Sequence, residues 1–121
     1  MKPEFRALED QLKQAMTSQA KVLVYRPPAL TAGQALAGVL AITASRTGIE
    51  VIVHETAKAK RLSCLLVTHR CAFSVKPASS IPDAFIFVST AEDDSELNEF
   101  AARIVRHLDY HQRQFASSPL K

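Results

Sequence analysis

Hydrophobic residues recur at intervals of three and four positions at both ends of the chain. Near the N-terminus these are Phe5, Leu8, Leu12, Ala15 and Met16, and charged or polar residues separate them. After the acidic segment Glu92–Asp94 the stripe comprises Leu97, Phe100, Ala101, Ile104, Leu108 and Phe115. This spacing places apolar side chains on one face of a helix. We therefore expect an amphipathic helix over about 3–18, a long C-terminal helix, and a frayed tail over about 117–121.

Short runs rich in β-branched and aromatic residues predict five strands between these two helices. They lie at 21–25, 49–54, 62–68, 71–76 and 84–88. The last run, Ala84–Val88, is apolar at every position, which is typical of a strand buried on both faces. Only His69 and Arg70 separate the third run from the fourth, so an antiparallel hairpin is expected there.

The segment over about 32–46 predicts a third, internal helix that is apolar on nearly every side. Thr31 is its expected N-cap, and no charged residue precedes Arg46. Gly38 is expected where another backbone approaches closely, because a glycine elsewhere would only weaken the helix. Since this helix joins the strands at 21–25 and 49–54, those strands are expected to be parallel.

Together these elements predict one domain over residues 1–121 with the order α-β-α-β-β-β-β-α. The fold class is α+β, arranged in two or three layers, with a mixed sheet of about five strands and flanking helices. A length of 121 residues fits a single core. The internal helix needs covering by a terminal helix or by a second subunit.

Composition narrows the class of protein. Hydrophobic residues make up 47% and charged residues 22%, which excludes a disordered chain. Two cysteines are too few for a disulfide scaffold, and a buried structural role is expected for both, Cys64 and Cys71. The sequence contains no apolar run of roughly 18 residues and no signal-peptide core at its start. We expect a cytoplasmic protein with no membrane partner.

Positive charge is concentrated in the middle of the chain. Residues 21–80 contain eight basic and two acidic residues, a net charge of +6, whereas residues 81–121 have a net charge of −3. One interpretation is a solvated surface. The other is contact with DNA, RNA or an acidic partner through Lys58, Lys60, Arg61, Arg70 and Lys76.

Motifs for cofactor or metal chemistry are weak. Residues 26–33 lack the glycine pattern of a phosphate loop and include two prolines, so no nucleotide cofactor is expected. His107 and His111 have the spacing of a metal-binding pair on a helix, but no third ligand accompanies them and no metal is expected. An anion or ligand site is possible where parallel strands end, formed by Arg26, Thr31, His54 and Glu55.

These observations favour a small non-enzymatic module that acts through protein–protein contact, as a homodimer or as a subunit of a larger assembly. Its interface is expected on the C-terminal stripe, at Leu97, Phe100, Ile104 and Leu108. A nucleic-acid-binding protein that uses the basic middle segment is the second hypothesis. A small enzyme with its site at Arg26, His54 and Glu55 is the third.

Overall fold

The computed structural model describes residues 3–27, 35–90 and 93–117, with side chains as far as Arg113. The helices are α1 (Pro3–Ala15), α2 (Thr56–Thr68) and α3 (Asp94–Ser117). The strands are β1 (Val22–Tyr25), β2 (Val39–Ser45), β3 (Gly48–His54), β4 (Phe73–Pro77) and β5 (Ala84–Ser89), and a short 3-10 turn, η2 (Leu36–Gly38), precedes β2. The predicted α+β class and five-stranded sheet are confirmed, but the observed order is α-β-β-β-α-β-β-α.

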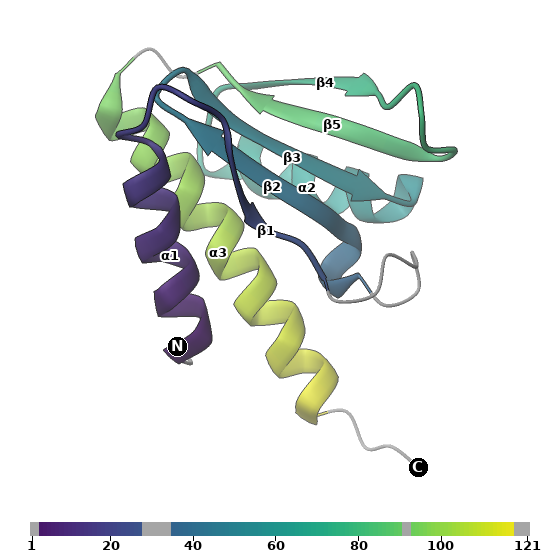
Figure 1. Ribbon diagram of the computed structural model, residues 1–121. Coiled ribbons are helices and arrows are strands. Elements are labelled where there is room, and N and C mark those ends of the chain that lie inside the picture. The colour runs from purple at the N-terminus through teal and green to yellow at the C-terminus, as the bar shows by residue number, and fades with distance from the viewer. Residues whose placement is uncertain (1–2, 28–34, 91–92, 118–121) are drawn as a thin grey trace.

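The five strands form one sheet in the order β1-β2-β3-β5-β4. Every neighbouring pair is antiparallel, so the expectation of a mixed sheet was wrong. The strands β1 and β3 do run in the same direction, as expected, because β2 lies between them and is antiparallel to both. The strands β1, β2 and β3 follow one another as a meander. The helix α2 then carries the chain across to the far edge, where β4 begins and β5 returns beside β3 (Figure 1).

All three helices lie on the same side of the sheet (Figure 1). Side chains of paired residues point to the same side of a sheet, and the row Ile42, Val51 and Phe87 points toward the helices. These residues join one core with Leu12 of α1, Leu62 and Leu66 of α2, and Ile104 and Leu108 of α3, all of them fully buried. The apolar faces of the three helices and the inner face of the sheet thus pack together as one core.

The internal helix predicted over 32–46 is not present in the part of the chain that the structure describes. Residues 36–38 form the turn η2 and residues 39–45 form the strand β2, while Thr31 and residues 32–34 lie outside the described residues. Because β2 is a central strand, its residues are buried or half-buried on both faces, which gives a continuous apolar run. Such a run has no period of its own, so it cannot be told from a buried helix by pattern alone.

The segment 62–68, predicted as a strand, is the second half of the helix α2. Ala59, Leu62 and Leu66 are spaced by three and four residues and point into the core, while Val67 is 65% exposed. The expected hairpin is therefore wrong, because His69 and Arg70 end a helix. Both cysteines are free, and Cys64 is exposed and Cys71 half-buried, so the expectation that both are buried was wrong.

Gly38 does lie at a close backbone contact, although for a different reason from the one expected. It adopts a left-handed φ of 79° just before β2, and a Cβ added there would lie 2.7 Å from the His54 carbonyl oxygen. We expect Gly38→Ala to lower the free energy of unfolding by at least about 1–2 kcal/mol, the cost of a left-handed L-residue, with the contact adding to it. Urea unfolding measures this directly.

Ala37 provides the matched control, since it is in the same turn and is also left-handed, at φ 55°. Ala37→Gly relieves backbone strain and removes only one methyl group, so its effect is expected to stay below about 1 kcal/mol. Equal losses from the two variants would contradict a specific requirement for glycine at position 38.

Candidate interaction surface

The sheet face opposite the helices carries apolar side chains from four strands. Register places Ala41, Ile52 and Ile86 in one row across this face, and Lys76 of β4 ends that row. The neighbouring row runs from β1 to β4 through Leu23, Thr43, Glu50, Val88 and Ser74. Ile52, Ile86 and Val88 are half-buried, and Leu23 is 46% exposed. We call this surface the open face.

The open face follows from strands that are apolar on both sides. In β3, Ile49, Val51 and Val53 point toward the helices, whereas Ile52 points away from them. In β5, Phe87 points inward and Ile86 points outward. Strands of this composition normally lie between two covering layers. Among the residues that the structure describes, helices form a layer on one side alone.

A pocket of about 380 Å³ opens at one end of the open face. Its walls are apolar and come from β2, β3 and the loop before β5, with Leu40, Ile52 and Ile81 among them. Arg26 and His54 add the polar groups. The Nδ1 atom of His54 is buried, has no hydrogen-bond partner among the described residues, and lies 4.0 Å from Glu55 Oε2.

The structure brings together part of the predicted anion or ligand site. Arg26 and His54 line the same pocket, whereas the Glu55 carboxylate approaches Lys58 Nζ at 3.4 Å, and Thr31 lies outside the described residues. The sheet is antiparallel, so the crevice at the ends of parallel strands on which that site was predicted does not form.

Glu55 has a structural role at this end of the sheet, because its backbone helps to connect α2 with the loop before β5. It adopts φ 79° and ψ 126°, a strained backbone for a residue other than glycine. Its N–H donates to the Asp83 carbonyl oxygen at 2.9 Å, and the Thr56 hydroxyl donates to Asp83 Oδ1 at 2.7 Å. These bonds tie the start of α2 to the residue that precedes β5.

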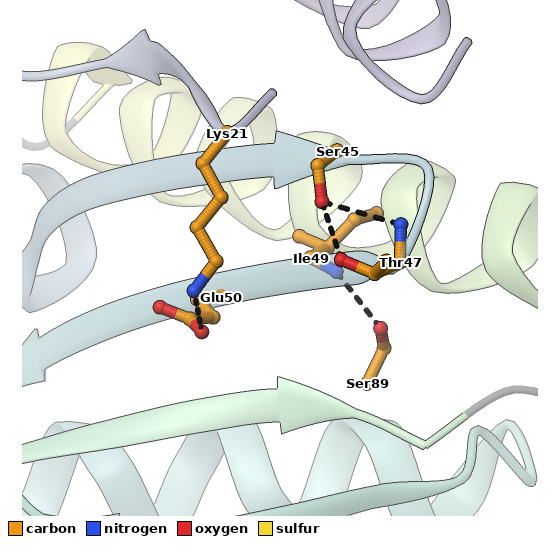
Figure 2. A network of polar contacts seen from close by, with 6 residues as sticks. All are labelled: Lys21, Ser45, Thr47, Ile49, Glu50 and Ser89. Carbon is orange, nitrogen blue, oxygen red and sulfur yellow. Dashed lines mark hydrogen bonds and ion pairs between the residues drawn. The ribbon is translucent and has the colours of Figure 1, made fainter. Parts of the chain in front are cut away.

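Figure 2 shows the polar contacts near the other end of the sheet. The Lys21 ammonium donates to Glu50 Oε2 at 2.5 Å, so the carboxylate in the open-face rows is paired. The Ser45 and Thr47 hydroxyls lie 2.7 Å apart in the β2–β3 turn, and the Ile49 N–H donates to Ser89 Oγ at 3.0 Å. Both sets of polar contacts lie near the β2–β3 turn, and Ala41, Ile52 and Ile86 form the apolar row of the open face.

The predicted basic contact residues are distributed over several parts of the fold. Lys60 and Arg61 are exposed on α2, and Lys58, on the same helix, pairs with Glu55. Arg70 follows the end of α2, while Lys76 lies on the open face, on the opposite side of the sheet from α2. These five residues therefore do not form one stripe, and contact with DNA or RNA stays a prediction.

The hydrophobic stripe of α3 is packed inside the chain. Leu97, Phe100, Ile104 and Leu108 are at most 7% exposed and contact the common core. An interface built on them would require the fold to open. The equivalent stripe of α1, which includes Phe5, Leu8 and Leu12, is buried in the same core.

His107 and His111 lie side by side at the C-terminal part of α3, with ring centroids 4.5 Å apart. Burial, then His111 and then Arg61 lower the pKa of His107 to about 4. Burial, Arg61 and Lys58 lower the pKa of His111. The described residues contain no group of three or more metal-ligating side chains. Nearby cations and burial together favour the neutral imidazoles.

The sequence matches no protein-family model, and neither a curated protein nor a solved structure is similar to it. Within the described part of the chain, no helix is long and apolar enough to cross a membrane. Sequence reasoning did not identify Ile52, Ile86 and Val88 as surface residues, although the two-sided apolar run of β5 was the signal that could have done so.

Proposed function

We propose that this protein is a non-enzymatic protein–protein interaction module that self-associates through the open face. One observation carries the proposal: β3 and β5 present apolar side chains on both faces, and the helices of the described residues cover just one of these faces. Exposed apolar surface in contiguous patches is typical of association sites. A second sheet packed on the open face would supply the missing layer.

A second copy of this chain suits this surface. In a two-fold dimer the same patch meets itself, so a strongly charged centre would repel its own image. The open-face row that begins at Ala41 has Ile52 and Ile86 at its centre. Glu50, in the neighbouring row, is neutralised by Lys21. Near the two-fold axis of such a dimer, apolar side chains of one copy would therefore pack against apolar side chains of the other.

The test is the oligomeric state of a variant with a charge in this row. We expect the wild-type chain to sediment as a dimer at about tens of micromolar, a concentration suited to micromolar affinity. Ile52→Glu should sediment as the 13.3 kDa monomer, because two buried carboxylates would face each other across the interface. Ile52 is half-buried in the isolated chain, so the substitution leaves the main core intact.

Val67→Glu is the matched control. Val67 is 65% exposed on α2, on the helix side of the sheet, and this variant should remain dimeric. Circular dichroism shows whether each variant is folded. A wild-type chain that is monomeric throughout this concentration range, or dissociation by Val67→Glu with Ile52→Glu still dimeric, would exclude the open face as the interface.

A further inference from the structure

The two edges of the sheet differ in how they are protected against strand addition. The edge strand β4 contains Lys76 and Pro77, a charge and a residue without an N–H, which both hinder pairing with another strand. The other edge strand, β1, has the sequence Val-Leu-Val-Tyr and contains neither device. Val22 and Leu23 are 41% and 46% exposed. Among the described residues no strand pairs with the outer edge of β1, so its backbone groups are open to a partner strand.

A groove runs between this edge and the helix α1. It consists of two adjoining cavities of about 350 and 430 Å³ that share Gln11 of α1 and Val24 of β1 as lining residues. Gln14 and Val22 line the first cavity, and Leu8 and Tyr25 line the second. The groove thus follows the whole of β1, a strand of four residues.

A β-bulge aims one side chain of β1 into this groove. Leu23 pairs with Thr43 and Tyr25 pairs with Ile42, so Val24 is an extra residue with no partner on β2. A bulge of this kind redirects the side chain of the extra residue. Val24 lines both cavities and forms an apolar floor where they meet.

We propose that this groove binds an extended segment of a partner protein, which pairs with the free edge of β1 as a sixth strand. A strand edge presents alternating N–H and C=O groups, and an extended backbone is the ligand that satisfies both. Alternate side chains of the segment would enter the groove, where valine and leucine contact apolar residues and Gln11 and Gln14 offer amide donors and acceptors.

The geometry favours a segment over a second folded copy. Four residues of β1 span roughly 13 Å at about 3.3 Å per residue, which is a short ladder for joining two domains. A flexible segment can also fill the two cavities beside the ladder. Among the residues that line the two cavities, Glu4 is the one whose side chain is charged at neutral pH, which suits an apolar and uncharged segment.

The probe is a phage-displayed library of random dodecapeptides, selected on the full-length protein. We expect the enriched peptides to alternate apolar and polar residues and to contain no proline in their central part. A synthetic copy of the best peptide, measured by fluorescence anisotropy, should lose at least tenfold in affinity when alternate backbone nitrogens are methylated. That modification removes strand hydrogen bonds and keeps the side chains.

Two variants of α1 locate the site. Gln11 is exposed and lines both cavities, so Gln11→Trp fills the groove and should weaken peptide binding at least tenfold. Asp10 is the exposed neighbour outside the groove, and Asp10→Trp should change the affinity less than twofold. Because Ile52 lies outside the groove, Ile52→Glu should retain the peptide, which separates this site from the proposed open-face interface.

Three results would overturn the proposal. The first is a selection that enriches no peptide, and the second is binding that tolerates both Gln11→Trp and backbone methylation. The third is a wild-type dimer that Gln11→Trp converts to a monomer, because a second copy would then occupy the groove. Retained binding by Asp10→Trp, together with loss in Gln11→Trp, supports it.

Discussion

Leu108→Ala is expected to lower the free energy of unfolding by about 2–5 kcal/mol and to leave the oligomeric state of the folded chain unchanged. Leu108 is fully buried and belongs to the core shared by the sheet and the three helices. Truncation of a buried leucine loses the transfer free energy of its side chain and leaves a cavity. Urea unfolding and sedimentation of the same sample measure both quantities.

Tyr110, two residues further along α3, is the matched control. Its side chain is 59% exposed, so Tyr110→Ala should change the stability by less than about 0.5 kcal/mol. If α3 instead formed an intermolecular interface, Leu108→Ala would weaken association and scarcely change the stability of the monomer. A dimer that dissociates in Leu108→Ala, with stability unchanged, would contradict the packing described above.

The terminal helices could be predicted from the sequence because each has one buried and one solvated face. In α1, Phe5, Leu8 and Leu12 alternate with charged residues, and this contrast gives the period directly. The same contrast predicted α3. The sequence could not show which surface the stripes contact, because an intramolecular core and a subunit interface require the same pattern.

The errors fall in segments that lack this contrast. The residues of β2 are buried or half-buried on both faces, so alanines and β-branched residues follow one another without a period, and the segment was predicted as a helix. In α2 the opposite error arose, because Leu62, Leu65, Leu66 and Val67 cluster within six residues. Tertiary burial of Leu62 and Leu66, with Val67 exposed, distinguishes this helix from a strand.

The candidate surface depends on strand order, which local sequence does not determine. Ile52 and Ile86 are 34 positions apart in the chain, and they become neighbours because β5 inserts between β3 and β4. The sequence did show that Ala84–Val88 is apolar on both faces. What it could not show is that the three helices of the described residues would gather on one side of the sheet, with Ile86 pointing to the other side.

Stability is expected to depend on pH through His107. This side chain is 8% exposed on α3, and burial, His111 and Arg61 lower its pKa from 6.5 to about 4. The unfolded chain therefore binds a proton at His107 between pH 6.5 and 4, whereas the folded chain does not. The contribution of the neutral His107 to the free energy of unfolding is fully present above about pH 6.5, and it is lost as the pH falls toward 4.

Protonation of His107 in the unfolded chain is expected to lower the free energy of unfolding by about 3 kcal/mol between pH 7 and pH 4, at about 1.4 kcal/mol for each pKa unit. His107→Gln cannot be protonated, so the difference in unfolding free energy between the wild type and this variant should move by that amount across this range. Carboxylates titrate in both proteins and cancel in the difference. If the difference in unfolding free energy between the wild type and His107→Gln stays constant from pH 7 to 4, His107 has the same pKa in the folded and unfolded chains, and the prediction is wrong.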